Sequence, residues 1–453
     1  MHRVLFETMG CRLNQAETAI LQSRFVERGY ALADDPSEAD LFVLHTCTLT
    51  THTTAKCRRR LRQVIRQNPA ACVAAIGCYA QTDAAELAQI EGVDFVVGTA
   101  DKLRLADLIT TPAKQVRPVV MTSRATPAAF TIDGTGYDPR HTRANLKIQE
   151  GCDFVCAFCI IPRSRGRARS RDFADLVREA RTLAVRGHRE IVLTGVNIGT
   201  YRDGARSLVD VIRALDEIDG LDRIRISSIE PTTIDDAVLD LMDGGGKLCP
   251  YLHVPLQSGD DAVLSGMRRR YHVDDYRRFM YRAQERVTGI TFGTDVIVGF
   301  PGEDDAAFER SCRIIEEFPF VNVHVFSFSA RPRTSAHTMP QRIAPREIQR
   351  RRDHLHRIGQ RQCQSVYQAM AGRDLRVLFE PRTADGMFCG FSDEYVRVVV
   401  SSNDDIAREL LSVRVIDVDA SSDGERLVAR GEIARDTTGT AQRRLYEKSV
   451  CMD

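Results

Sequence analysis

Cys152-Asp153-Phe154-Val155-Cys156-Ala157-Phe158-Cys159 is the stretch around which the rest of the chain is organised. Its three cysteines are spaced by three and then two residues, and an aromatic residue, Phe158, stands just before the last of them. One short loop with this spacing can fold three thiolates onto a single iron–sulfur cluster, whereas four thiolates would occupy every iron. Three ligands therefore leave one iron free to bind another molecule.

This spacing, with Phe158 in place, resembles the signature of the radical S-adenosylmethionine (SAM) enzymes. In that superfamily the free iron chelates the amino and carboxylate groups of SAM, and an electron from the cluster splits a carbon–sulfur bond to give a deoxyadenosyl radical. The alternatives are buried cysteines and a structural zinc site, which takes four protein ligands. The nearest candidate for a fourth ligand, His141, lies upstream without a second Cys or His pair beside it.

Length and composition set the class of protein. The chain has 453 residues, which corresponds to about three domains. No apolar run reaches the ~18 residues of a membrane-spanning helix, and the N-terminus is unlike a signal peptide, so we expect a cytoplasmic monomer. Thirteen cysteines in a reducing compartment favour metal ligands over disulfides. Because the net charge is only +1, affinity for nucleic acid must come from local basic patches.

Residues 1–111 alternate strand and helix patterns, which predicts a doubly wound parallel sheet. The strand candidates are 4–6, 41–44, 72–76 and 94–97, and residues 14–28 and 53–67 have helical patterns. Cys11, Cys47 and Cys78 each follow one of the first three strands. Open α/β sheets build their sites beyond the carboxyl ends of the strands, so these cysteines are expected to meet at one rim. The alternative is small buried cysteines, which we expect for Cys72.

The rest of the chain divides into four segments. Residues 112–144 are rich in Pro and Gly without sustained periodicity and predict a linker. Residues 145–370 repeat strand and helix six times, which predicts an open, partial version of the eight-unit barrel, with its site at the carboxyl ends of the strands. Residues 371–437 contain five short strand patterns typical of a small β-barrel of the oligonucleotide-binding kind. Residues 438–453, which include Cys451, form a tail.

The three parts together resemble the radical-SAM methylthiotransferases over essentially the whole chain. Gly10-Cys11-Arg12-Leu13-Asn14-Gln15 is similar to the opening of the threonylcarbamoyladenosine tRNA members. The isopentenyladenosine members typically carry Gln-Met-Asn after that cysteine, and the ribosomal-protein members Pro-Lys-Asn. The resemblance implies a transferase with two 4Fe–4S clusters, one on Cys152, Cys156 and Cys159 and an auxiliary one on Cys11, Cys47 and Cys78. It also implies that the final barrel is a TRAM domain that binds RNA; the alternative is a barrel used for packing or protein contact.

The resemblance further implies the reaction. One SAM methylates a sulfur on the auxiliary cluster, and a second gives a radical that removes hydrogen from the adenine carbon between the two ring nitrogens, which then takes the methylthio group. That carbon offers no acidic proton, so acid–base catalysis would not suffice. The implied substrate is N6-threonylcarbamoyladenosine next to the tRNA anticodon, splayed out of its stack. A flavodoxin- or ferredoxin-like electron donor is expected, and the sulfur source stays open.

Three alternatives remain at this point. Two keep the chemistry and change the substrate, either to isopentenyladenosine in tRNA or to a side chain of a ribosomal protein. The third is a non-catalytic, iron–sulfur-stabilised module that binds RNA.

Several strand ends of the predicted central barrel are candidates for contact with SAM. The resemblance places backbone after the second strand against the amino end of SAM, polar groups after the third strand near its ribose or amino group, and the end of the fifth strand on its adenine. An ordinary turn is the alternative for the Thr-Gly pair, and His253 and Asp295 are interpreted as satisfied polar groups. No catalytic residue is expected beyond the cluster ligands. The candidates are Phe158, Thr194, Gly195, Ser228, Glu230, Val298, Gly299 and Phe300.

Arginines follow the three-cysteine stretch at every second position. Residues so spaced cannot share one helix face, which predicts an extended loop with guanidiniums available for phosphates. A charge run is usually a solvated face, but in a chain that is neutral overall we expect RNA contact here more than elsewhere. The five residues are Arg163, Arg165, Arg167, Arg169 and Arg171.

Overall fold

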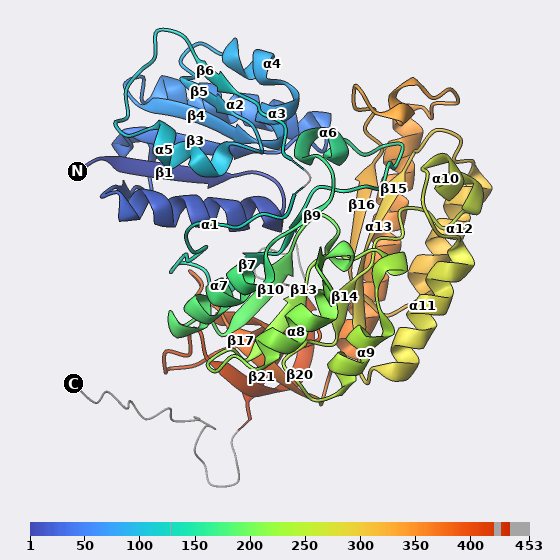
Figure 1. The fold of residues 1–453 in the computed structure, drawn as a ribbon. Coiled ribbons are helices and arrows are strands. Elements are labelled where there is room, and N and C mark those ends of the chain that lie inside the picture. The colour runs from blue at the N-terminus through green and yellow to red at the C-terminus, as the bar shows by residue number, and fades with distance from the viewer. Residues whose placement is uncertain (127, 421–426, 435–453) are drawn as a thin grey trace.

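The computed structural model describes residues 1–126, 128–420 and 427–434. Pro127 of the predicted linker, residues 421–426 and 435–437 of the predicted barrel, and the predicted tail with Cys451 lie outside the described residues. Three units follow one another along the chain (Figure 1): a blue N-terminal sheet with helices, a green to orange central unit, and a red β-barrel at the bottom of the view.

The N-terminal unit is a six-stranded parallel sheet with the order β2-β1-β3-β4-β5-β6. Apolar side chains on both faces of the sheet form separate buried clusters, which is why the central strands β3 and β4 are buried along their whole length. The doubly wound parallel sheet predicted from the sequence is confirmed. Its strands are β1 Arg3–Thr8, β2 Ala31–Leu32, β3 Leu41–Thr46, β4 Cys72–Gly77, β5 Phe95–Val97 and β6 Val119–Met121. Its helices are α1 Arg12–Glu27, α2 Thr51–Gln67, α3 Cys78–Thr82, α4 Ala84–Ala88 and α5 Leu105–Leu108.

Strand β6 lies within residues 112–144, for which the sequence predicts a linker. It pairs in parallel with β5 and closes one edge of the sheet. The strand has only three residues and follows Pro118, so its apolar run is shorter than the roughly 4–8 residues by which a strand is recognised in a sequence. This part of the predicted linker is therefore an edge strand of the N-terminal sheet.

The central unit contains six parallel strands in two halves, β13-β10-β7 and β14-β15-β16. Isolated bridges, Ile224 to Leu248 and Ser228 to His253, connect the halves. The result is the partial barrel predicted from the sequence, with its main core between strands and outer helices. The strands are β7 Arg143–Lys147, β10 Glu190–Thr194, β13 Arg223–Ile226, β14 Tyr251–His253, β15 Thr291–Val298 and β16 Phe320–Ser327. The helices are α7 Phe173–Val185, α8 Leu208–Asp216, α9 Asp236–Asp243, α10 Asp261–Gly266, α11 Val273–Arg286, α12 Asp305–Glu317 and α13 Pro345–Gln368.

The burial pattern of β15 shows which face of this sheet is covered and which is open. Thr294, Val296 and Val298 are buried, whereas Asp295 and Ile297 between them are partly exposed, the alternation of a strand with one covered face. On β16, His324 and Phe326 are exposed in the same way. We call this open inner face, marked by Asp295, Ile297, His324 and Phe326, the lumen.

Short elements connect β7 to the first barrel helix: β8 Gln149–Glu150, α6 Ile161–Arg165 and β9 Arg169–Ser170, and a hairpin of β11 Arg202–Asp203 and β12 Arg206–Ser207 follows β10.

The C-terminal unit is a closed five-stranded barrel with the order β17-β18-β19-β21-β20, as predicted. Its apolar core includes residues of β14, β16 and α13, so the barrel is packed against the base of the central unit. Arg223 and Arg225 strengthen this junction by donating to the backbone carbonyls of Phe391 and Asp393, both at 2.9 Å. The strands are β17 Asp374–Phe379, β18 Phe388–Ser392, β19 Arg397–Val400, β20 Leu410–Ala420 and β21 Leu427–Ile433.

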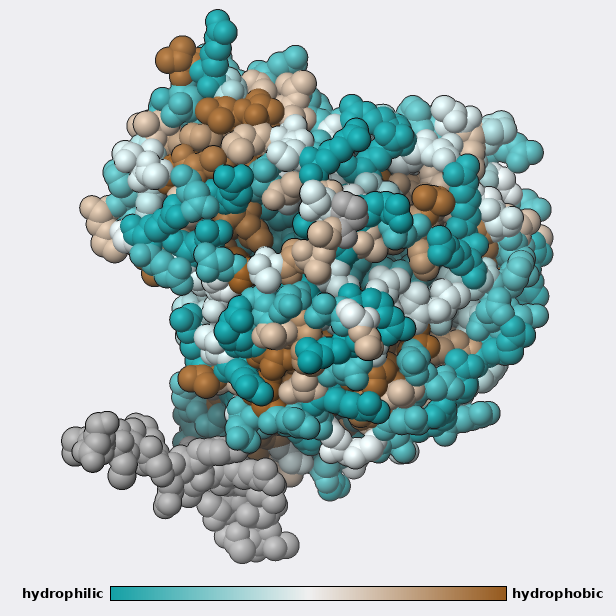
Figure 2. Space-filling view, viewed as in Figure 1, coloured by the Kyte–Doolittle hydropathy of each residue, from teal (hydrophilic) through white to brown (hydrophobic). Residues whose placement is uncertain are grey.

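Among the described residues, no helix combines the length and the apolar character needed to cross a membrane. The face shown in Figure 2 is mostly hydrophilic, with apolar residues in small groups between polar ones.

Candidate active site

The loop with Cys152, Cys156 and Cys159 lies between β8 and α6 and is tied to two other segments. The N–H of Ala157 donates to the carbonyl of Met267 at 2.9 Å, and the carbonyl of Ala157 accepts from the N–H of Ala336 at 2.8 Å. Within the loop, the Phe154 N–H donates to the Cys152 Sγ at 3.3 Å. These bonds fix the loop, so that all three thiols lie on one short turn.

The surroundings of these thiols suit a metal group that is held by thiolates. Burial, with a contribution from the neighbouring cysteines, raises the pKa of the Cys159 thiol to about 12 and that of the Cys152 thiol to about 11. A bound metal would hold such thiols as thiolates, which are the metal ligands. Arg269 adds a fixed cation, since its Nη1 lies 3.2 Å from the Cys156 Sγ. The donor set therefore fits an iron–sulfur cluster with three thiolate ligands.

Cys11, Cys47 and Cys78 follow β1, β3 and β4, which are neighbours in the sheet. Cys11 precedes α1 as its N-cap residue, and Cys78 opens α3. Burial raises the pKa of Cys47 to about 12, with further contributions from Cys78 and Cys11, so the three thiols lie within electrostatic range of one another. The sheet thus brings together three cysteines that are far apart in the sequence, and they form a second set of three soft sulfur ligands.

Two glycines leave room for this second set. Gly10 has a φ of +119°, and a Cβ on it would lie 3.0 Å from the Cys47 Cβ and 3.3 Å from its Sγ. Gly77 has a φ of +95°, and a Cβ there would lie 2.5 Å from the His45 ring. Both positions combine a backbone conformation that favours glycine with a lack of space for a side chain.

Asn14 connects the two strand ends to a buried group of charges. Its side-chain nitrogen donates to the carbonyls of Met9 at 2.9 Å and Thr46 at 3.3 Å, which precede Cys11 and Cys47. Its side-chain oxygen accepts from the Arg165 guanidinium at 2.6 Å. Asn14 therefore positions the loops that carry two of the cysteines.

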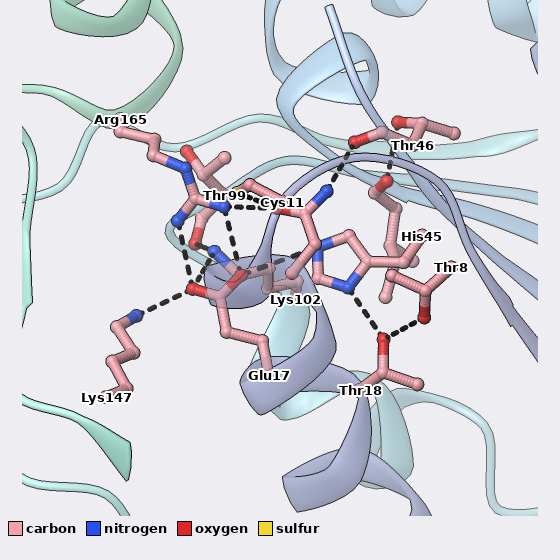
Figure 3. A network of polar contacts seen from close by, with 12 residues as sticks. Thr8, Cys11, Glu17, Thr18, His45, Thr46, Thr99, Lys102, Lys147 and Arg165 are labelled. Carbon is pink, nitrogen blue, oxygen red and sulfur yellow. Dashed lines mark hydrogen bonds and ion pairs between the residues drawn. The ribbon is translucent and has the colours of Figure 1, made fainter. Parts of the chain in front are cut away.

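Figure 3 shows the buried charges, in which the Glu17 carboxylate points toward three cations. Glu17 Oε1 lies 3.0 Å from Lys102 Nζ, 2.7 Å from Lys147 Nζ and 3.0 Å from Arg165 Nη1. Glu150 contacts the same three cations at 3.3, 2.7 and 2.9 Å. We call Glu17, Lys102, Lys147, Glu150 and Arg165 the ion cluster. It joins the N-terminal and central units. Glu17 and Lys102 belong to the N-terminal unit, and Lys147, Glu150 and Arg165 belong to the central unit.

The ion cluster has three cations for two carboxylates, and its excess positive charge lies near the second set of cysteines. Burial raises the pKa of the Cys78 thiol, while Arg165 and Lys102 oppose the shift. Three thiolates bring negative charge into a buried site, which is costly unless it is compensated. The ion cluster provides this compensation, because Arg165 and Lys102 oppose the shift at Cys78 more strongly than Glu17 adds to it.

The lumen has a continuous polar and aromatic wall. Tyr395, at a turn of the C-terminal barrel, stacks on Tyr251 with ring centroids 4.5 Å apart. The Tyr251 hydroxyl lies 3.4 Å from His253 Nδ1, and His253 Nε2 lies 3.0 Å from Asp295 Oδ1. His324 Nδ1 lies 3.0 Å from the same Asp295 oxygen.

At each end the wall continues toward one set of cysteines. The hydroxyl of Tyr395 accepts a hydrogen bond from Arg12, the residue after Cys11. At the other end lies Glu230. Burial is the main cause that raises the pKa of this carboxyl, Arg269 lowers it, and Asp295 also raises it. Arg269 contacts Glu230 and Cys156.

Comparisons with known proteins support this arrangement. Residues 146–315 match the Radical SAM superfamily, and residues 3–98 match Uncharacterized protein family UPF0004. Threonylcarbamoyladenosine tRNA methylthiotransferase MtaB of Bacillus subtilis is 35% identical over 425 residues, which cover 92% of this chain and 94% of that protein. The chain belongs to the radical-SAM tRNA methylthiotransferase family.

Another relative in this family has a different nucleoside in its name. The tRNA-2-methylthio-N(6)-dimethylallyladenosine synthase of Cereibacter sphaeroides is 34% identical over 434 residues, which cover 94% of this chain and 99% of that protein. A solved structure of the radical SAM methyltransferase TsrM of Kitasatospora setae, with cobalamin and a [4Fe-4S] cluster bound, superposes with a TM-score of 0.56 at 16% identity. The superposition covers 86% of this chain and 81% of the TsrM chain. This likeness shows the fold alone.

Membership of the family settles several expectations. Its members are radical-SAM transferases, which sets aside the non-catalytic RNA-binding module, and the superfamily implies SAM and a 4Fe–4S cluster. The zinc alternative has no support from His141, whose Nδ1 pairs with Asp138 at 3.1 Å. Cys72 is buried in the core, as expected.

The structure places most of the predicted SAM-contacting residues at the carboxyl ends of barrel strands. Thr194 ends β10, and a Cβ on Gly195 would lie 2.9 Å from Gln149 Oε1, which accepts from the N–H groups of Val196 and Asn197. Phe158 and Phe300 belong to one apolar cluster. Ser228 bridges to His253, Glu230 pairs with Arg269, and Val298 is buried in the barrel core. Gly299 has a φ of +79°, and its N–H donates to the Glu303 carboxylate at 2.6 Å.

The prediction of a fully extended, phosphate-binding arginine loop is wrong for most of its residues. Arg165 ends helix α6 and lies in the ion cluster, and Arg171 is buried with its Nε 2.6 Å from Asp175 Oδ2. Arg169 pairs with Glu150 at 2.7 Å. The carboxylates that neutralise these guanidiniums are Glu17, Glu150 and Asp175, and the arginine spacing alone does not show them. Arg163 and Arg167 are exposed, and RNA contact there stays a prediction.

Sequence reasoning did not find Arg269, Asn14 or the ion cluster as parts of the site. Glu17 lies inside a helix, and Lys102 and Lys147 stand alone in their segments, so no local pattern marks them. The one available signal was Asn14, three residues after Cys11, where a helix N-terminus follows a strand-end cysteine.

Proposed function

We propose that this chain adds a methylthio group to the adenine ring of N6-threonylcarbamoyladenosine next to the anticodon of tRNA. The observation that carries the proposal is the pair of cysteine triads, one on a barrel loop and one at the rim of the N-terminal sheet, at opposite ends of one lumen wall. Two such sites suit a reaction that needs a radical and a source of sulfur. The assignment of the nucleoside is supported by Gly10-Cys11-Arg12 and by the relative named for threonylcarbamoyladenosine.

The residues that would hold the two 4Fe–4S clusters are Cys152, Cys156 and Cys159 for one and Cys11, Cys47 and Cys78 for the auxiliary one. When bound, the clusters and SAM would supply the electron, the radical and a place to hold the sulfur for methylthiolation, with one SAM as methyl donor and another as radical source. Each set offers three thiolates, and such a donor set is suited to hold an iron–sulfur cluster.

The protein residues would bind SAM and orient it. Backbone at Thr194 and Gly195, held by Gln149, is suited to the amino end of SAM, and Ser228 and Glu230 to its ribose or amino group. Phe158 and Phe300 offer an apolar surface to the adenine, together with the backbone of Val298 and Gly299. Arg269 would hold Glu230 in place and place a positive charge beside Cys156.

The partners belong to the same proposal. The C-terminal barrel resembles RNA-binding barrels, and we assign it the tRNA contact together with Arg163 and Arg167. A flavodoxin- or ferredoxin-like protein would supply electrons to the cytoplasmic, monomeric enzyme.

The test is mass spectrometry of nucleosides from bulk tRNA of the source organism with and without this gene. Loss of the methylthio form of threonylcarbamoyladenosine alone is the expected result. Loss of the isopentenyl counterpart instead would favour the second candidate, which the relative from Cereibacter sphaeroides supports. Unchanged tRNA would contradict both and favour a ribosomal protein as the substrate.

A further inference from the structure

We propose that Arg12 binds the carboxylate of the threonylcarbamoyl group and thereby selects this nucleoside over uncharged N6-modified adenosines. The inference rests on the proposed function and names the residue that reads its substrate. Isopentenyl and threonylcarbamoyl groups differ in charge, because only the second carries a carboxylate. A binding site that separates them therefore needs a positively charged donor in reach of the N6 substituent.

Arg12 is held at the junction of three units. It begins α1 directly after Cys11, and its Nη2 donates to the Tyr395 hydroxyl of the C-terminal barrel. Its guanidinium carbon lies 5.7 Å from the centroid of the Tyr395 ring. Tyr395 in turn stacks on Tyr251 of the lumen wall. The guanidinium thus lies where the auxiliary cysteines, the lumen and the final barrel meet.

Arg12 differs from the other arginines around Tyr395 in its partners. Arg225 Nε donates to Glu190 at 2.9 Å, and Arg143 Nη2 donates to Glu380 at 2.9 Å. Within residues 1–126, 128–420 and 427–434, no carboxylate is within ion-pair distance of Arg12, and its hydrogen-bond partner is a neutral phenol. A guanidinium has five N–H donors in a planar fork that matches a carboxylate. Most of those donors remain for a ligand.

The charges along the lumen wall also point to this end. Burial alone would raise the pKa of Tyr395, yet Arg12, Arg143 and Arg225 together lower it, which reports a positive potential at that ring. At the other end of the wall stand the carboxylates of Asp295 and Glu230. An incoming carboxylate would find a guanidinium without an acidic partner at the Arg12 end, whereas Arg269 at the other end is already paired with Glu230.

The position of Arg12 beside Cys11 places this contact near the proposed sulfur site. The adenine ring must bring its reacting carbon close to the auxiliary cysteines, while its N6 substituent extends over neighbouring residues. A bidentate contact between Arg12 and the carboxylate would fix that orientation as well as the choice of substrate. A site built to bind a polar group rejects an analogue that lacks it, because its donors are left unpaired.

The experiment compares three anticodon stem-loop RNAs that differ only in the N6 group of one adenosine: threonylcarbamoyl, its carboxylate methyl ester, and isopentenyl. The reconstituted full-length enzyme and its Arg12→Gln and Arg12→Lys variants are assayed for kcat/KM on each. We expect the wild type to prefer the acid over the ester by about 10- to 100-fold, the range for a hydrogen bond to a charged group. Arg12→Gln should reduce that preference to within about threefold, and Arg12→Lys should retain part of it because it keeps the charge.

Controls separate recognition from loss of the site. Iron content, visible absorption and RNA-free reductive cleavage of SAM should match the wild type in Arg12→Gln. Arg286→Gln, which breaks an exposed pair with Asp236 on the outer helix α11, is the matched loss of one arginine and should keep the full acid-to-ester ratio. If Arg12→Gln fails to load iron, Tyr395→Phe tests the same contact from another domain, and it should lower the ratio several-fold.

The outcomes distinguish the two proposals. A wild-type enzyme with no activity on the threonylcarbamoyl RNA overturns the proposed function. An active wild type that treats acid and ester alike, or an iron-loaded Arg12→Gln variant that still discriminates between them, overturns only the role of Arg12. If Arg12→Gln cannot be loaded, an unchanged ratio in Tyr395→Phe overturns it as well.

Discussion

The two cysteine triads are built in opposite ways. Cys152, Cys156 and Cys159 come from a single loop that backbone hydrogen bonds fasten in place. Cys11, Cys47 and Cys78 come from the ends of three strands and are backed by the ion cluster, which draws on two units of the molecule. The first triad is a local property of the sequence, whereas the second exists only after the sheet has formed and the two units have docked. We therefore expect that substitutions can impair one triad without the other, and for different physical reasons.

Removing one ligand from each triad should give the largest difference. Cys152→Ala should reduce reductive SAM cleavage to background, whereas Cys47→Ala should spare it and abolish only the methylthio product. Deoxyadenosine and the modified nucleoside, both measured by mass spectrometry, report the two activities. SAM cleavage that survived in Cys152→Ala would remove the basis for assigning the loop triad to SAM.

Removing one anion from the ion cluster should damage the second triad through its support. Glu17→Gln leaves Lys102, Lys147 and Arg165 with too little compensating charge, and breaking a buried ion pair in this way costs about 3–5 kcal/mol. Thermal unfolding and iron content measure the effect, and we expect about half of the iron to be lost while SAM cleavage persists.

The matched control for Glu17→Gln is Asp374→Asn, which breaks an exposed pair with Arg414. Exposed pairs contribute about 0–1 kcal/mol, so this variant should keep its iron. Equal losses in both variants would show that the ion cluster is no more important than a surface pair.

Removing the one cation beside the loop triad should have a smaller effect. Arg269→Gln leaves Glu230 buried without its partner and takes a charge from beside Cys156. Changes of this kind around metal ligands cost about 10- to 100-fold, and we expect a loss in the rate of SAM cleavage near the lower end. Arg270→Gln is the neighbouring control, since this guanidinium packs over Phe154 at 4.1 Å, and its loss should change the rate by about twofold.

Lowering the pH should change the contributions of Glu17 and Glu230 to the stability of the fold in opposite directions. Although burial would raise it, the pKa of Glu17 is held well below 4.5 by Arg165, Lys102 and Lys147. Glu17 therefore stabilises the fold above about pH 4.5 and loses this contribution as the pH falls toward its folded pKa. Burial raises the pKa of Glu230, so its contribution falls as the pH rises through that pKa.

The measurement is thermal unfolding of the metal-free protein between pH 5 and pH 3.5, where one proton corresponds to about 1.4 kcal/mol per pH unit. Glu17→Gln should flatten the loss of stability in acid, and Glu230→Gln should steepen it. The same change of slope in both variants would contradict the assigned directions.

The sequence predicts the fold well wherever a feature is local. The five strands of the final barrel and the six barrel units follow from apolar patterns and turn residues, and the strand-end cysteines follow from the patterns before them. Strand β6 escapes because it has only three residues within a stretch that contains Pro112 and Pro118. Arg165 escapes because its partner Glu17 is distant in the sequence. Arg171 escapes although Asp175 and Glu179 are near in the sequence, because the spacing of charges does not tell a buried ion pair from a solvated charge run.

For the same reason only part of the site is predictable from the sequence. The cysteines were predicted at strand ends, but Tyr395, Tyr251 and Arg12 meet only because three units pack together. Arg12 was noticed only as part of the stretch Gly10-Cys11-Arg12, and nothing in the sequence connects it with Tyr395 or Tyr251. Pair contacts of this kind depend on tertiary structure, which no pattern within one segment encodes.

The Tyr395 turn has a consequence for the order in which this enzyme matures. Synthesis proceeds from the N-terminus, and domains generally fold as they emerge. Cys11, Arg12 and the loop triad leave the ribosome long before Tyr395 does. A nascent chain therefore has its cysteines in place while the lumen still lacks one side of its wall. With the proposed role of Arg12, selective recognition of the substrate would begin only after the C-terminal barrel has been synthesised, later than the capacity of the two triads to hold iron.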